Sequence, residues 1–187
     1  PDESYHGITY TERFGLEGAY ITKATAQLMR DFGSIQAPQH AFLLNLGLES
    51  LPLRMERHSE NALAVAEFLE KHPKVSWVNY AGLPSSPYHA LAEKYLPKGC
   101  CGVVSFGVKG GRDAAGVFMK SLKLGMIATH VADARTCVLH PASSTHRQMN
   151  DAELAAAGVG PDLIRLSVGI ENKEDILADL EQALASI

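Results

Sequence analysis

The spacing of the apolar residues divides the chain into a helical first part and an alternating second part. Pro38 opens a run with helical spacing, which is kinked or broken at Pro52 and continues to Lys71. Some 30 residues of helix at ~1.5 Å each are long enough to link two domains. Residues 1–40, with one helix that ends near Gly33, show no convincing core of their own. A long helix is therefore expected to connect a coreless segment to the rest of the chain.

Short apolar runs alternate with helical stretches from residue 72 to the last residue. Strands are expected at 75–80, 102–108 and 163–168 and as short pieces within 127–139, and helices at 113–122, 150–157 and 172–187. This alternation is typical of an α/β fold in which helices pack on a sheet. The sequence thus predicts three parts, namely residues 1–40, a linking helix at 41–71 and an α/β domain at 72–187.

One arginine stands inside the strand that is expected at 163–168. In an extended run, Ile164 and Leu166 point to one face, whereas Arg165 points to the other. A guanidinium that loses water in this position needs an anionic partner. The spacing leaves two partners open, an internal salt bridge to Asp or Glu, which is the commoner case, or the carboxylate of a ligand gripped by the planar fork.

Composition removes several classes of function. The formal net charge is -4, and no basic patch is clustered, which argues against nucleic-acid binding. No apolar run approaches the length of a membrane span, and the polar first residues do not form a signal peptide. The odd count of 3 cysteines suits a reducing compartment, so we expect a cytoplasmic protein. His140 and His146 have no cysteine or carboxylate at metal-ligand spacing, and no metal site is expected.

The order of motifs in the last third of the chain resembles a known enzyme family. His140-Pro141-Ala142-Ser143 precedes a helix start at Asn150, then the Arg165 strand, then a second helix start near Asn172. This order resembles the C-terminal end of the pyridoxal 5'-phosphate (PLP) enzymes of cysteine and methionine metabolism. Within that family, residues 1–7, 51–58 and 140–143 look most like the O-acetylhomoserine sulfhydrylase branch, and the resemblance extends over the whole chain.

The resemblance implies a fold-type-I PLP enzyme. Residues 72–187 would form its C-terminal small α/β domain, residues 41–71 the linking helix, and residues 1–40 the tail of its large cofactor domain. Relatives assemble as homotetramers, so a homo-oligomer is implied as well. In the family, the arginine at the position of Arg165 binds the α-carboxylate of the substrate, and the segment around Thr136 lines the same pocket. Relatives often have asparagine at His130 and glycine at Ala132, so this loop departs from the family pattern.

The resemblance also implies that the cofactor lysine lies outside this chain. Family members hold PLP through a Ser-x-x-Lys segment that lies upstream of the part matched here. Thr22-Lys23 is no substitute, because it sits in an amphipathic helix and no glycine pair follows it. No catalytic or cofactor-binding residue is therefore expected in this chain, which we interpret as the C-terminal part of a longer enzyme.

The implied activity of the intact enzyme is a PLP-dependent γ-replacement in methionine biosynthesis. Acetate of O-acetylhomoserine would be replaced by sulfide or a small thiol, which gives homocysteine or methionine. Cystathionine γ-synthase, cystathionine γ-lyase and methionine γ-lyase remain as alternatives within the trans-sulfuration family. Outside the enzymes, the chain could be an inert fragment that serves only assembly.

Overall fold

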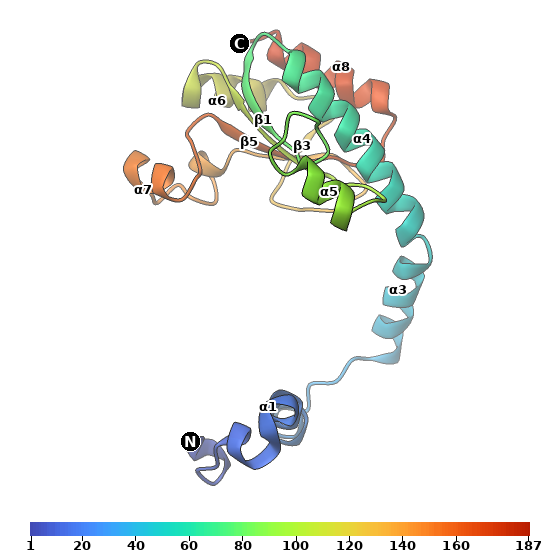
Figure 1. The fold of residues 1–187 in the computed structure, drawn as a ribbon, viewed down its shortest axis with the longest axis vertical. Coiled ribbons are helices and arrows are strands. Elements are labelled where there is room, and N and C mark those ends of the chain that lie inside the picture. The colour runs from blue at the N-terminus through green and yellow to red at the C-terminus, as the bar shows by residue number, and fades with distance from the viewer. The chain divides into compact units, whose positions relative to one another are not determined.

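The computed structural model describes residues 1–187, which form two compact units (Figure 1). The first unit spans Pro1–Glu49 and the second spans Ser50–Ile187. None of the helices combines the length and the apolar character that a membrane span needs.

The first unit is helical and has little core. Its elements are η1 (Glu3–Tyr5), α1 (Tyr10–Thr22), the π-helical turn η2 (Lys23–Met29), α2 (Arg30–Phe32) and α3 (Pro38–Glu49). Gly33 follows α2 with a φ of 67°, a left-handed conformation in which glycine commonly ends a helix, as the sequence predicts. The buried side chains are Tyr10, Ala19 and Gln27, and the Tyr10 hydroxyl donates to Gln27 Oε1 at 2.6 Å.

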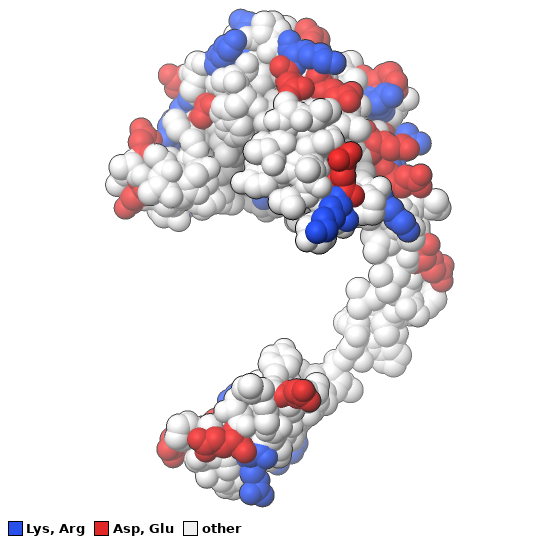
Figure 2. Space-filling model, in the orientation of Figure 1, with Lys and Arg blue, Asp and Glu red and all other residues white.

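Helix α3 presents apolar side chains on every side. None of its residues is buried, and Phe42, Leu44 and Leu48 are 64%, 61% and 59% exposed. Figure 2 shows this helix as an almost unbroken white surface, without the mixed charges that cover the second unit. An exposed apolar surface of this kind is typical of a segment that packs against other protein.

The second unit contains all five strands of the chain. Its elements are α4 (Leu51–Lys71), β1 (Val75–Asn79), α5 (His89–Tyr95), β2 (Val103–Val108), α6 (Gly111–Ser121), β3 (Met126–Ile127), β4 (Cys137–Leu139), η3 (Pro141–Ser143), α7 (Asp151–Ala156), β5 (Leu163–Ser167) and α8 (Lys173–Leu184). The sheet order is β1-β2-β5-β4-β3, in which β3 and β4 are parallel and the other neighbours are antiparallel. Strand β5 is therefore central, and Arg165 pairs with Ser105 on one side and Leu139 on the other.

Helices α4, α6 and α8 cover one face of this sheet (Figure 1). Phe106, Ile164 and Leu166 point into the layer between helices and sheet, and all three are fully buried. The alternation in β5 thus places Ile164 and Leu166 in the core and Arg165 on the opposite face, as the sequence predicts. The α/β fold is confirmed.

The boundary between the parts differs from the expected one. The helical segment predicted at 41–71 is divided at Ser50, so that Pro52 lies in the first turn of α4, where a proline costs no hydrogen bond. Val65 and Leu69 of α4 are fully buried in the core of the sheet. Helix α4 is therefore part of the α/β unit, which begins at Ser50 and not at the predicted residue 72.

Candidate functional site

Arg165 lies half-buried on the face of the sheet that the three helices leave open. One terminal nitrogen, Nη2, donates to the carbonyl of Thr129 at 2.9 Å. Its Nε is buried and has no hydrogen-bond partner, and no Asp or Glu of the chain forms an ion pair with it. The internal salt bridge, the commoner interpretation from spacing alone, is therefore wrong. A buried donor on a cation is costly to leave unpaired, which indicates a site for an anionic ligand.

A cavity of about 470 Å³ adjoins Arg165. Its wall is mostly apolar with a few hydroxyls, and its lining residues are Val103, Ser105, Thr129, Leu139, Pro141, Thr145, His146, Val159, Leu163 and Arg165. No acidic side chain lines it, so Arg165 is the only permanent charge there. A single cation in a largely apolar wall favours a small ligand that carries one negative charge.

Arg112, in the same unit, is an arginine whose guanidinium is paired within the protein. Its Nη2 lies 2.6 Å from a carboxylate oxygen of Asp151, and its Nη1 donates to the carbonyl of Ala142 at 3.1 Å. These contacts join α6 to the segment around η3 and α7. Arg165 differs because it holds one backbone carbonyl and keeps the rest of its fork free.

Thr136 directly precedes β4, the strand next to β5, but does not line the cavity. Its hydroxyl donates to Glu171 Oε2 at 2.9 Å and accepts from the backbone N–H of Gly169 at 2.9 Å. Its backbone N–H donates to the other carboxylate oxygen of Glu171 at 2.6 Å. The side chain is buried, and both hydrogen-bonding capacities of the hydroxyl are used inside the protein. The structure therefore does not bring the two predicted substrate-binding side chains together.

The loop between β3 and β4 carries the carbonyl that holds Arg165. Ala132 adopts a φ of 58°, a left-handed conformation that favours glycine, and its N–H donates to Ser167 Oγ at 3.0 Å. An alanine thus stands at position 132 in a conformation that suits glycine. Hydrogen bonds from Arg135 lower the pKa of Asp133 to about 2, which keeps this ion pair formed in the loop at neutral pH.

His140 is held within the protein by both of its ring nitrogens. Its Nδ1 lies 2.8 Å from Ser143 Oγ and its Nε2 lies 2.8 Å from the carbonyl of Pro161. Both ring nitrogens are engaged, and the residue is buried. It is therefore not available for proton transfer.

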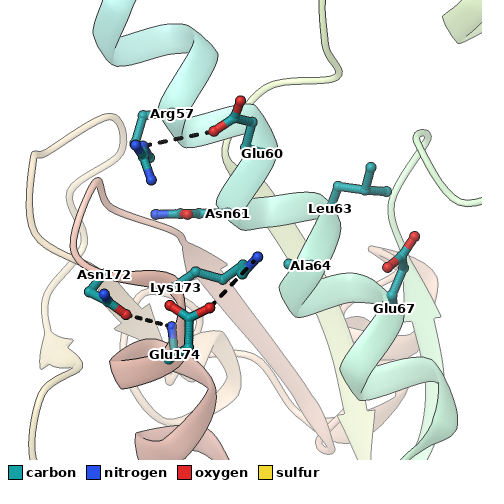
Figure 3. Close-up of a pocket in the computed structure, with 9 residues that line it drawn as sticks. All are labelled: Arg57, Glu60, Asn61, Leu63, Ala64, Glu67, Asn172, Lys173 and Glu174. Atoms are coloured by element: carbon teal, nitrogen blue, oxygen red, sulfur yellow. Dashed lines mark hydrogen bonds and ion pairs between the residues drawn. The ribbon is translucent and has the colours of Figure 1, made fainter.

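A second cavity, of about 530 Å³, lies between α4 and the start of α8 (Figure 3). Its charged side chains face one another, with Arg57 3.8 Å from Glu60 and Lys173 3.8 Å from Glu174. Asn61 is also satisfied, because its amide donates to two backbone carbonyls. This cavity contains no buried donor in need of a ligand, so the Arg165 cavity is the better candidate.

No lysine of the chain is placed to hold PLP. Lys23 lies in η2, is half-exposed and forms an ion pair with Asp2, and every other lysine is exposed. A lysine that carries a cofactor needs a desolvated position in which its amine loses its proton easily. The lysines of this chain therefore do not fit PLP by themselves. The chain instead supplies the Arg165 cavity.

Comparison with known proteins identifies the family. Residues 15–185 match the model of the Cys/Met metabolism PLP-dependent enzymes. The chain is 48% identical to O-acetyl-L-homoserine sulfhydrylase of Leptospira meyeri and 50% identical to homocysteine synthase of Schizosaccharomyces pombe, and the matches cover 100% and 98% of the chain but 44% and 43% of those proteins.

A solved structure agrees with the sequence matches. The crystal structure of a putative O-acetylhomoserine (thiol)-lyase from Campylobacter jejuni, which contains a pyridoxyl-lysine monophosphate, matches with a TM-score of 0.84 and 41% identity. The match covers 100% of this chain and 44% of that one, so the chain spans less than half the length of its relatives. The chain belongs to the Cys/Met metabolism PLP-dependent enzyme family.

Proposed function

We propose that this chain is the C-terminal part of a PLP-dependent O-acetylhomoserine sulfhydrylase. The enzyme replaces the acetate of O-acetylhomoserine with sulfide or a small thiol and releases homocysteine or methionine. The names of the similar proteins from Leptospira meyeri and Schizosaccharomyces pombe support this reaction. The observation that carries the proposal is the unpaired, partly buried guanidinium of Arg165 beside an acid-free cavity.

Arg165 binds the α-carboxylate of the amino-acid substrate. Its planar fork donates two parallel hydrogen bonds to a carboxylate, and the contact to the Thr129 carbonyl fixes the plane of the fork. A carboxylate held in this way fixes the orientation of the bonds around the substrate α-carbon. PLP supplies the electron sink for chemistry at that carbon, and other residues of the enzyme hold it.

Thr136 lies outside the cavity and supports the site indirectly. Its hydrogen bonds to Gly169 and Glu171 tie the start of β4 to the segment that follows β5. Thr136 is therefore a positioning residue. Its hydroxyl holds the backbone near the site in place and does not itself contact the substrate.

The enzyme works as a homo-oligomer, which we take to be a tetramer in the cytoplasm. The apolar surface of α3 supports packing on other polypeptide, since five of its large apolar side chains are more than half exposed: Phe42 64%, Leu43 54%, Leu44 61%, Leu46 51% and Leu48 59%. The three cysteines are all free, which fits a reducing compartment.

The test is substitution of Arg165 in the full-length enzyme. Arg165→Ala removes the fork and is expected to cost roughly 2–4 kcal/mol of transition-state stabilisation, measured as kcat/KM for O-acetylhomoserine. Arg165→Lys keeps the charge but not the two parallel donors, so it should fail to restore activity. Arg57→Ala is the matched control, because it removes an arginine whose partner is Glu60 and which lies outside the cavity.

Two results would contradict the proposal. A folded Arg165→Ala enzyme with unchanged kcat/KM would remove Arg165 from the substrate site. Turnover of cystathionine or methionine that exceeds turnover of O-acetylhomoserine with sulfide would assign the enzyme to another member of the family.

A further inference from the structure

The cavity beside Arg165 contains one further ionisable side chain, His146. The sequence places His146 in a loop-like stretch and gives it no role, and the proposed function does not use it. In the structure it lies half-buried in the cavity wall that Pro141 and Thr145 also form. Since no acidic side chain lines this cavity, no carboxylate of the chain competes there with a ligand for an N–H donor of His146.

The backbone around His146 is held by a compact set of hydrogen bonds. The carbonyl of Pro141 accepts from the N–H of Ser144 at 3.1 Å and from the N–H of His146 at 2.9 Å. The Ser144 hydroxyl donates to the carbonyl of His140 at 2.6 Å, and His140 is itself fixed at both ring nitrogens. The position of His146 is therefore set by the fold and not by a mobile side-chain contact.

The imidazole of His146 has one nitrogen engaged and one free. Its Nδ1 lies 2.9 Å from Thr145 Oγ1, whereas its Nε2 has no partner in the chain. When the threonine hydroxyl donates to Nδ1, the neutral ring carries its hydrogen on Nε2, and a protonated ring also donates from Nε2. In this hydrogen-bond arrangement the free Nε2 of His146 offers a donor.

We propose that His146 is a second substrate-binding residue, which donates from Nε2 to the carboxylate that Arg165 grips. This inference rests on the proposed function and adds the residue that completes carboxylate recognition. The ligand class is an α-amino acid whose carboxylate enters the cavity. A carboxylate has lone pairs for more donors than one arginine fork supplies, so a neighbouring imidazole adds a charge-assisted hydrogen bond.

The experiment compares two inhibitors of the full-length holoenzyme that differ only at the carboxylate. L-2-aminopentanoate carries the carboxylate, and 2-aminopentan-1-ol carries a hydroxymethyl group in its place. His146→Ala is expected to raise the inhibition constant of the acid, and the KM for O-acetylhomoserine, roughly tenfold, while kcat and the constant of the alcohol stay the same. Thr145→Val should shift the constant of the acid in the same direction by a smaller factor.

Two controls separate binding from folding. His89→Ala removes another half-buried histidine, which lines a different cavity, and should leave both inhibition constants unchanged. His146→Gln supplies a side-chain N–H donor and should recover part of the affinity for the acid. This recovery is expected even if His146→Ala lowers the melting temperature.

The outcomes distinguish this inference from the proposed function. If Arg165→Ala weakens the acid but His146→Ala does not, the role of His146 is overturned and that of Arg165 stands. An equal loss for acid and alcohol in His146→Ala also overturns it, because the residue would then be purely structural. If Arg165→Ala itself has no effect, the proposed function fails first.

Discussion

At the residue scale, Gly169 and Thr136 explain how the site is kept rigid. A side chain at position 169 would place its Cβ 2.5 Å from both the carbonyl of Ala134 and the N–H of Thr136. Glycine therefore allows the segment after β5 to approach the loop before β4 closely enough for the hydrogen bonds of Thr136 and Glu171. These hydrogen bonds hold the loop that carries Thr129, whose carbonyl accepts from Arg165.

Thr136→Val is predicted to destabilise the protein by about 1–3 kcal/mol, because the N–H of Gly169 and one oxygen of Glu171 lose a buried partner. Thr136→Ser keeps the hydroxyl and should cost much less. Urea unfolding of the two variants measures the difference. An unchanged free energy of unfolding in Thr136→Val, combined with a raised KM, would mean that the hydroxyl meets the substrate and not Glu171.

Part of the site follows from the sequence at this scale, and part does not. Period-two alternation places Arg165 on the open face of the sheet, and this prediction is confirmed by the buried neighbours Ile164 and Leu166. Its contact with Thr129 and its cavity neighbour His146 were not predicted, because they arise from segments 36 and 19 residues away along the chain whose approach depends on strand order. Local spacing carries no information on that order.

At the element scale, the short helix α7 depends on its first turn. The Asn150 side chain accepts from the N–H groups of Ala152 and Glu153 at 3.0 Å each, and the Glu153 carboxylate accepts from the N–H of Asn150 at 2.8 Å. These contacts form a capping box at the helix start that the sequence predicts at Asn150. Leu154 is the only buried residue of the helix, so packing contributes little and the cap contributes much.

Asn150→Ala is predicted to cost about 0.5–2 kcal/mol, because two N–H groups at the start of α7 lose their acceptor. Amide hydrogen exchange should show the loss as faster exchange confined to α7. Gln148→Ala, an exposed position just before the helix, is the control and should leave exchange unchanged. Faster exchange in β5 as well would show that the cap supports more than its own helix.

Most elements of the second unit follow from the sequence, but α5 and the break at Ser50 do not. The strands and the helices α6, α7 and α8 were expected, because each shows a clear period in its apolar residues. Helix α5 was not, since it has seven residues and buries only Ala92. The break at Ser50 was also misplaced, because Pro52 suggests a kink in sequence but fits the first turn of a new helix in the structure.

At the scale of the whole molecule, the hydrophobic core lies entirely within the second unit. Every residue of the buried cluster falls between Ser50 and Ile187, and α4 supplies Ala62, Val65, Ala66 and Leu69. The first unit buries few side chains, and α3 buries none. The free energy of folding that comes from apolar burial is therefore concentrated in residues 50–187.

Residues 50–187 are accordingly predicted to fold without the first unit. The fragment should unfold cooperatively in urea, with a midpoint close to that of the 187-residue chain, because it retains the whole buried cluster. Residues 1–49 alone should show no cooperative transition. A midpoint that falls sharply when residues 1–49 are removed would show that the first unit stabilises the second.

A matched fragment tests which boundary is physical. Residues 72–187 correspond to the domain predicted from sequence but lack α4, so one face of β1 and β2 loses its cover. Truncation of even one buried leucine, such as Leu69→Ala, typically lowers the free energy of unfolding by about 2–5 kcal/mol. This is a large part of the stability of an ordinary domain. The shorter fragment should therefore lose its cooperative transition and bind hydrophobic dyes. Cooperative unfolding of residues 72–187 would instead restore α4 to the role of a linking helix.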